Sequence, residues 1–183
     1  MKKILITIIL SLLTKTILYS QNNNALIKSI DSIYTEINYN LKSNNSNFIQ
    51  IENSSNTDDS QKTAVFKNKK LKLLRVEWFG ETGKSQIEYY FENTNLIFAI
   101  KHQYKYNRPI YWDKKTALEN EDIETYDTDK TKVKVDKYYF HNEKLFLWLD
   151  NEKLEQDLTL EMNKLIVQRL ISICYEIKNE FKI

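Results

Sequence analysis

Three copies of one short phrase constrain the fold of this chain more than any other feature. Each copy reads Phe-x-Asn-x-x-Leu, where x is any residue, and the copies span residues 66–71, 91–96 and 140–145. Each lies between two runs that are rich in apolar and aromatic residues. Asn tolerates the positive backbone φ angle that a tight chain reversal requires. The phrase therefore predicts a β-hairpin at all three positions.

The spacing of the phrases leaves two explanations open. The interval is 25 residues from Phe66 to Phe91 and 49 residues from Phe91 to Phe140, which is close to double. Such spacing fits a repeat of two-strand units in which an insertion at residues 107–130 replaces one unit. Alternatively, the phrase recurs because it is a general hairpin motif, and we favour this simpler explanation.

Apolar and polar residues alternate with a period of two from residue 63 onward, which is typical of half-buried strands. The predicted strands are 71–79, 85–91, 96–106, 131–140 and 145–149, and the sequence Gly-Glu-Thr-Gly at 80–83 predicts a turn between the first two. In the strand 96–106, alternation places Leu96, Phe98 and His102 on one face. That face is expected to pack and the other to contact water.

Two segments have the spacing of amphipathic helices. Residues 24–42 place apolar side chains three and four apart, with Asn24 as the N-cap. Residues 152–181 predict a long helix, with the buried stripe Leu158, Met162, Leu165, Ile166, Leu170, Ile173, Ile177 and Phe181. The predicted fold class is α+β: an antiparallel β-meander of about 5–7 hairpin-connected strands, packed on one face by the N-terminal and the long C-terminal helix.

One domain, residues 21–183, is expected to contain two irregular segments. Residues 43–62 are mostly Ser, Asn, Asp, Thr and Gln, which predicts a polar loop with at most one short strand. Residues 107–130 form an acidic insertion with a helical turn near residues 115–120, and Arg108-Pro109 ends the preceding strand because Pro cannot donate to a strand ladder. Its carboxylates lack the sharp turn and closing Glu of a calcium loop, which favours an ordinary acidic surface.

Residues 1–20 are predicted to be a signal peptide. Lys2 and Lys3 precede an apolar run at 4–13, and Lys15 makes the run too short to span a bilayer, which takes roughly 20 apolar residues. A buried N-terminal helix is the less favoured alternative. Cleavage after Ser20 gives a periplasmic or secreted protein, with no lipid-attachment cysteine and no membrane anchor. Cleavage also lowers the formal net charge from +2 to −1, so the charge gives no argument for nucleic-acid binding.

Residue types that carry chemistry are sparse, and we predict no catalytic, cofactor-binding or metal-binding residues. The single cysteine, Cys174, is expected to be a buried helix residue rather than a nucleophile or an intermolecular bridge. His102 and His141 have no zinc ligands at suitable spacing. The chain has only two glycines, too few for a glycine-rich phosphate-binding loop. Glu77 and Glu88 resemble a glycosidase acid pair, but cross-strand ion pairs are the ordinary outcome for such residues.

Aromatic residues are in excess, at 13% of the chain. Rigid amphipathic rings on a sheet suit a binding surface, although Tyr also fills strands because of its β-propensity. The candidate ligand or partner surface comprises six rings: Tyr90, Tyr106, Tyr111, Trp112, Tyr138 and Trp148. We therefore expect a binding module for a protein, peptide or glycan of the cell envelope. The alternatives are an inhibitor or protective protein of an envelope or secreted enzyme and, ranked last, a hydrolase.

Two stretches carry a resemblance to a known group of proteins. YYFENTNLIF at 89–98, followed by YKYNRPIY at 104–111, resembles small, uncharacterised exported bacterial proteins with a recurring Tyr-Tyr-Phe-acid-Asn-Gly-x-Leu hairpin. A second such hairpin precedes a Trp in that group, as residues 138–148 do here. The resemblance spans roughly residues 63–150 and implies export and the hairpin fold, but no activity. This chain departs from it at Thr94 and Glu143, where Gly is usual.

Overall fold

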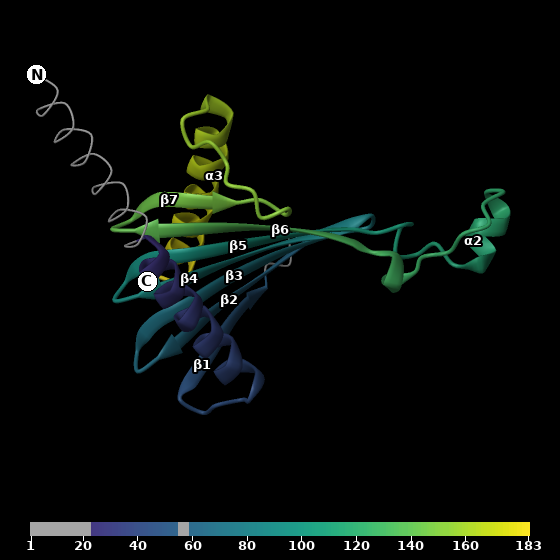
Figure 1. Ribbon diagram of the computed structural model, residues 1–183. Helices are drawn as coiled ribbons and strands as arrows, with labels where there is room; N and C mark the ends of the chain where they lie inside the picture. Colours follow the sequence, from purple (N-terminus) through teal and green to yellow (C-terminus); the bar gives the residue numbers. More distant parts are fainter. Residues whose placement is uncertain (1–22, 55–58) are drawn as a thin grey trace, which may run out of the picture.

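The computed structural model describes residues 23–54 and 59–183 (Figure 1). The predicted signal peptide, residues 1–20, and its cleavage site lie outside the described residues. Within them the chain forms a seven-stranded sheet in which each strand pairs antiparallel with its neighbours in sequence. The strands are β1 (Phe48–Ser54), β2 (Ser60–Lys67), β3 (Lys70–Gly80), β4 (Gly83–Glu92), β5 (Asn95–Lys105), β6 (Lys132–His141) and β7 (Lys144–Leu149). The predicted α+β class and antiparallel meander are confirmed.

All three Phe-x-Asn-x-x-Leu phrases form hairpins with the same register. The Phe and Leu of each phrase are paired across the two strands, as Phe91 and Leu96 are in β4 and β5. The two turn residues have positive φ in every copy: Asn68 and Lys69, Asn93 and Thr94, Asn142 and Glu143. Two such residues define a type I′ turn, whose twist matches that of the flanking strands. The predicted hairpins are therefore confirmed, and a repeated two-strand unit and a general hairpin motif both account for them.

A β-bulge follows each turn and reverses the expected alternation. The residue after each Leu is left out of the pairing, as Ile97 is between Leu96 and Phe98. Leu96 consequently packs on one face of the sheet and Phe98 on the other. The prediction that these two residues share a face was wrong, because a bulge shifts the alternation by one residue.

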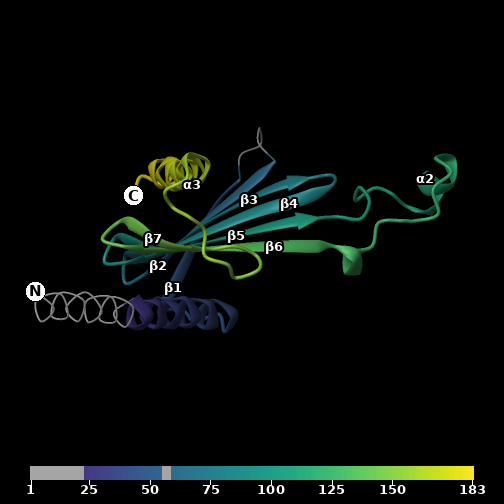
Figure 2. The same ribbon diagram turned by 45° about the horizontal axis from the view of Figure 1, so that its top comes forward.

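The two long helices lie on opposite faces of the sheet, which corrects the predicted packing on one face (Figure 2). The N-terminal helix, described over residues 23–42, packs through Ile30 and Ile37. Helix α3 (Glu161–Glu180) packs on the other face through Leu170, Cys174 and Ile177. The sheet needs both helices because adjacent residues of a strand point to opposite faces, and the pairs Leu73-Leu74, Tyr89-Tyr90 and Tyr138-Tyr139 are all buried. The arrangement is a helix–sheet–helix sandwich.

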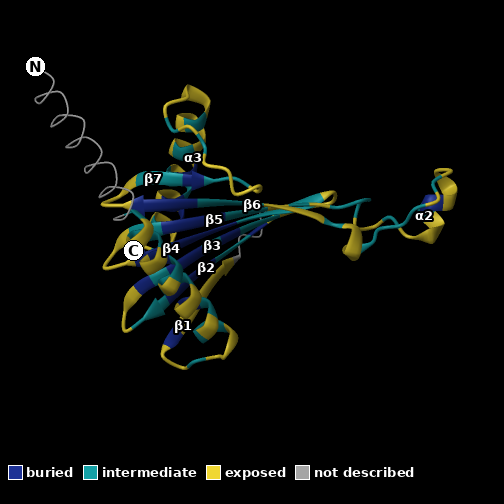
Figure 3. Ribbon diagram, in the orientation of Figure 1, coloured by how far each residue is buried: buried dark blue, intermediate teal, exposed yellow. Residues whose placement is uncertain are grey.

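Burial is concentrated towards the end of the sheet where the three Phe-x-Asn-x-x-Leu hairpins turn (Figure 3). The far ends of β5 and β6 are largely exposed, as at Gln103 and Lys134. Helix α3 also makes fewer buried contacts than the sequence predicts, since Met162 and Leu165 are exposed. Helix α3 packs on the sheet from Val167 onward, and its first two turns leave Met162 and Leu165 uncovered.

The two irregular segments are more ordered than expected. The polar stretch 43–62 contains β1 and the first residues of β2. The insertion contains helix α2 (Lys114–Glu119), as predicted, and a 3-10 turn at Thr128–Lys130. Both ribbon views show the insertion projecting well beyond the sheet (Figures 1 and 2).

The positive φ angles of the turns generate a prediction about stability. Thr94 has a φ angle of 73°, a conformation that is costly for a β-branched residue and free of that cost for Gly. Thr94→Gly should raise the free energy of unfolding by about 1 kcal/mol in urea denaturation. Thr82, in the turn between β3 and β4, is absent from the residues with positive φ. Thr82→Gly should therefore lower stability slightly, and effects of the same sign at both sites would contradict the assignment of the turns.

Candidate functional site

The segment that joins β5 to β6, residues 106–131, is called the arm here. Lys105 and Lys132 are paired across the two strands, so the arm leaves and re-enters the sheet at adjacent points. Arg108 forms a two-point contact with Asp122, from Nε to Oδ2 at 2.5 Å and from Nη2 to Oδ1 at 3.0 Å. The Trp112 indole N–H donates to the same carboxylate at 3.2 Å. These hydrogen bonds hold the pKa of Asp122 well below its usual range, and the bond from Arg108 has the largest effect.

A second set of contacts braces the base of the arm. The Asn107 side chain donates to the Thr125 carbonyl at 2.9 Å and accepts from the Asp127 N–H at 3.0 Å. The Tyr106 and Tyr126 rings meet edge to face with centroids 5.4 Å apart. A backbone bond of 2.8 Å from Tyr126 to Trp112 joins the two sides of the arm. Side-chain hydrogen bonds and ring contacts, rather than a regular strand ladder, therefore hold the two sides of the arm together.

The outer part of the arm exposes large apolar side chains. Leu118 is 79% exposed and Ile123 is 99% exposed; Ile110 and Tyr111 are each more than half exposed nearer the base of the arm, where the Ile110 N–H donates to the Glu81 carbonyl of the β3–β4 turn at 2.9 Å. A braced loop that presents apolar side chains to solvent is a candidate binding surface, because loops positioned by a rigid scaffold commonly carry binding residues.

A buried carboxylate lies at the centre of the sheet face that the N-terminal helix covers. Glu88 is 5% exposed and accepts bonds from Arg75 at 2.7 Å, Gln86 at 3.0 Å and the Tyr90 hydroxyl at 2.6 Å. Asn38 of the helix donates to the same hydroxyl at 2.9 Å. Lys84 pairs with Glu77 at 3.0 Å. Glu77 and Glu88 therefore form cross-strand ion pairs, as expected, and both carboxylates have cationic partners.

His102 lies beside this cluster. Burial lowers its pKa, Glu88 opposes the shift, and the cations Lys84, Arg75 and Lys137 add to it. The imidazole is therefore kept neutral in a cationic neighbourhood. It stacks on Tyr104 with ring centroids 6.2 Å apart. The arrangement is that of a half-buried structural histidine on the sheet.

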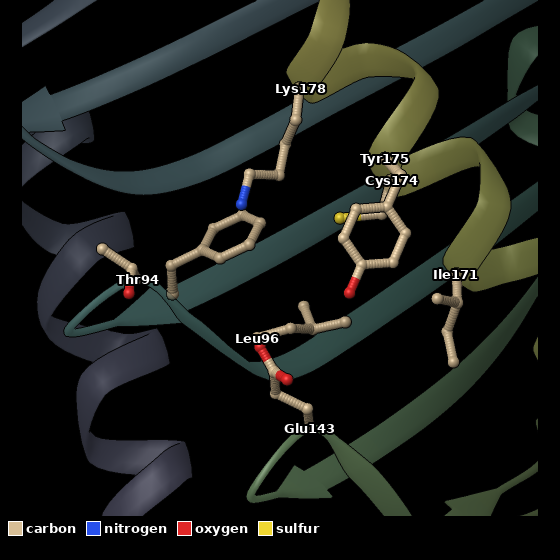
Figure 4. A pocket seen from close by; sticks show the side chains of 8 residues that line it. Thr94, Leu96, Glu143, Ile171, Cys174, Tyr175 and Lys178 are labelled. Carbon is tan, nitrogen blue, oxygen red and sulfur yellow. The ribbon is translucent and has the colours of Figure 1, made fainter. Parts of the chain in front are cut away.

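A small pocket opens between α3 and the turns of two hairpins (Figure 4). Its volume is about 40 Å³. It is lined by Phe91, Thr94, Leu96, Glu143, Ile171, Cys174, Tyr175 and Lys178. Burial raises the pKa of the Cys174 thiol to about 12, so the thiol stays protonated and is a poor nucleophile. A pocket of this size accommodates a few water molecules at most. Cys174 is a buried helix residue, as predicted.

The structure divides the six predicted surface rings into two groups. Tyr90, Tyr138 and Trp148 are buried in the core. For these three the prediction of a ligand-facing ring was wrong, because both faces of the sheet are covered at their positions. Tyr106 and Trp112 are half-buried and brace the arm, whereas Tyr111 is exposed. All three lie in the arm, where the Tyr111 and Trp112 ring centroids are 6.1 Å apart and the Tyr106 ring contacts Tyr126.

Sequence reasoning missed the most exposed apolar residues of the arm, Leu118 and Ile123. The available signal was the presence of two aliphatic side chains in a segment otherwise rich in acids, from Leu118 to Asp129. Aliphatic residues in such a segment either form a local core or remain uncovered, and here they remain uncovered.

The part of the chain that the structure describes lacks two kinds of feature. Residues 23–54 and 59–183 contain no group of three or more His, Cys, Asp or Glu side chains arranged to hold a metal ion. None of the helices in these ranges is both long and apolar enough to cross a bilayer. Comparison of the chain with known protein families, curated proteins and solved structures gives no significant match.

The hydroxyl of Tyr90 provides a test of the buried cluster. Tyr90→Phe removes one bond to Glu88 and leaves Asn38 without its sheet partner, so unfolding in urea should cost about 2 kcal/mol less. Tyr138→Phe is the matched control, because the Tyr138 ring is equally buried and its hydroxyl makes no hydrogen bond within the described residues. It should change stability by less than about 0.5 kcal/mol. Equal losses in the two variants would contradict a structural role for the Glu88 cluster.

Proposed function

We propose that this protein is an exported binding module that engages a protein partner through the arm. The observation that carries the proposal is the combination of a side-chain-braced arm with uncovered apolar residues at its outer part. Export follows from the predicted signal peptide at residues 1–20. The rest of the domain serves to hold the arm at the end of a rigid sheet.

The contacts that brace the arm favour binding because they order the arm before it meets a partner. Ordering a flexible loop on association costs free energy, and a loop that is already ordered avoids most of that cost. The Arg108–Asp122 pair and the Asn107 bridges order the arm in the free protein. Burial of Leu118 and Ile123 against a partner then contributes fully to affinity.

The shape and chemistry of the arm favour a protein partner over a glycan. The arm projects from the molecule, so its complement is a cleft (Figure 1). Its most exposed residues are aliphatic, whereas glycan sites depend on aromatic rings and hydrogen-bonding side chains. Acids outnumber bases beside Leu118 and Ile123 in the sequence, since Glu119, Glu121, Asp122 and Glu124 are accompanied only by Lys114 and Lys115, of which Lys115 pairs with Glu119 at 3.8 Å. The complementary cleft is therefore apolar with a basic rim.

The projecting arm also fits a second function, in which the protein inhibits or protects against an envelope or secreted enzyme. Enzyme active sites are concave, and a stiff projecting segment is the shape that fills them. In this version the partner of the arm is a hydrolase or a toxin. Turnover assays on the captured partner, with and without this protein, distinguish inhibition from simple binding.

Substitution at the outer part of the arm tests the proposal. The double variant Leu118→Asp, Ile123→Asp should lose at least about tenfold in partner capture from a cell-envelope extract, because two apolar contacts are replaced by charges. The free energy of unfolding should stay within about 0.5 kcal/mol of wild type, since both side chains are exposed. Tyr39→Asp is the matched control, as Tyr39 is 71% exposed on the N-terminal helix.

A second variant removes the arm altogether. Because Lys105 and Lys132 are paired, residues 106–131 can be replaced by the two-residue turn Asn-Gly, which suits a type I′ hairpin. The sheet should form and the partner should no longer be captured. Undiminished capture by this variant would rule out the arm as the binding surface.

A further inference from the structure

The N-terminal half of α3 leaves an apolar groove on the sheet. On one side of the helix the groove has a volume of about 300 Å³ and is lined by Ile87, Lys101, Tyr138, Leu165, Ile166 and Arg169, among others. On the other side a hollow of about 250 Å³ lies between α3 and Leu145. A cavity of about 150 Å³ admits benzene, so the larger groove has room for a branched aliphatic side chain. This pair of hollows and the helix between them are called the α3 groove.

The apolar character of the α3 groove extends to its surroundings. Met162 is 67% exposed and Leu165 59%, and Leu160, the residue before α3, is also more than half exposed. Isolated exposed apolar residues are common, but a cluster around a groove marks an interaction site. The groove lies on the α3 face of the sheet, away from the Glu88 cluster.

Charge selects the occupant of the α3 groove. Among the described residues that line the two hollows, the charged side chains are Lys101, Arg169 and Lys164, and none is a carboxylate. Nearby acids offset part of this charge: Glu161 pairs with Lys164, Glu176 pairs with Arg169, and the carboxyl of Asp136, whose pKa burial raises, lies near Lys101. The lining itself is cationic, so it suits an apolar segment with acidic neighbours.

The arm has the complementary chemistry. Leu118 and Ile123 are its most exposed apolar side chains, and Glu119 and Glu121 are exposed between them. In both ribbon views the arm extends away from α3, so it does not reach the groove of its own molecule (Figures 1 and 2). A symmetric contact between two α3 grooves is disfavoured, because a two-fold axis would bring Arg169 and Lys164 towards their own copies.

We infer that the arm of one molecule docks in the α3 groove of a second copy of this chain. Leu118 and Ile123 occupy the apolar hollows, and Glu119 and Glu121 face Lys164 and Arg169. The contact is head-to-tail, so it builds a ring or an open chain of molecules rather than a symmetric dimer. This inference rests on the proposed function of the arm and names its partner as another copy of the protein.

Charge reversal on the two surfaces tests the inference with purified protein alone. The groove variant carries Lys164→Glu and Arg169→Glu, and the arm variant carries Glu119→Lys and Glu121→Lys. Sedimentation velocity from about 1 μM to about 1 mM should show wild type associating, with association weakened by about 0.5 M salt. Each variant alone should associate at least about tenfold more weakly. An equimolar mixture should regain association, because reversed arms meet reversed grooves and native arms meet native grooves.

A matched control separates specific contacts from net charge. Lys69→Glu with Lys70→Glu changes the charge by the same amount as the groove variant at an exposed hairpin turn, and it should leave association unchanged. Circular dichroism should show the same fold for all variants. A wild-type protein that is monomeric at about 1 mM overturns the inference, and so does a closed dimer that the arm variant leaves intact.

The same measurements separate this inference from the proposed function. If the wild type is monomeric but Leu118→Asp, Ile123→Asp abolishes capture of a different protein, the arm is a binding surface and the second copy is not its partner. If the arm variants affect neither association nor capture, both proposals are wrong. Association that both charge-reversed variants lose and their mixture regains supports the two together.

Discussion

Two adjacent tyrosines couple the sheet to a helix on each of its faces. The Tyr89 hydroxyl donates to the Leu170 carbonyl of α3 at 2.8 Å, and the Tyr90 hydroxyl joins Asn38 of the N-terminal helix to Glu88. Because neighbouring strand residues point in opposite directions, one dipeptide reaches both helices. Burial raises the pKa of both hydroxyls, so each remains a neutral donor. The sandwich depends on this coupling, since a sheet that is apolar on both faces is unstable with only one covered.

The two ends of the sheet serve different purposes. The end with the three Phe-x-Asn-x-x-Leu turns contains the aromatic core. On one face the rings of Tyr34, Tyr90 and Phe98 contact one another, and Phe98 also contacts Tyr139. The other end has little cover and leads into the arm, where the contact between Arg108 and Asp122 replaces hydrophobic packing. Stability is therefore concentrated away from the candidate binding surface. Such separation allows the outer part of the arm to vary without loss of the fold.

Much of the fold could be predicted from local patterns. The Phe-x-Asn-x-x-Leu phrase predicted three hairpins, since the φ preference of Asn and the flanking alternation act over a few residues. The placement of the helices could not be predicted in the same way. Each helix is amphipathic, but which face it covers depends on pairs such as Leu73-Leu74, which occupy both faces at once. The bulge at Ile97 recurs after all three phrases, but the alternation of apolar and polar residues does not reveal it, and it places Leu96 on the face opposite Phe98.

The candidate site was predicted only in part. The aromatic excess predicted Tyr90, Tyr138 and Trp148 as surface rings, but all three are buried. Composition does not distinguish a ring that fills a core from one that contacts a ligand. The arm was recognised as an acidic insertion, but its bracing depends on contacts such as Asn107 with Asp127, which are 20 residues apart. Helix α3 shows the same limit, since its period identified an apolar stripe but not that Met162 would lie beyond the sheet.

The sequential topology of the sheet has a consequence for folding kinetics. Each strand within the described residues pairs with its neighbours in the chain, so hairpins such as β4–β5 and β6–β7 are local and form early. The β5–β6 pairing is different, because it must close a loop that contains the whole arm. Compared with a two-residue turn, closing a loop of this length costs roughly 2 kcal/mol of chain entropy. We therefore expect docking of β6–β7 onto the remaining strands to be the slow step, and early internal bonding of the arm to accelerate it.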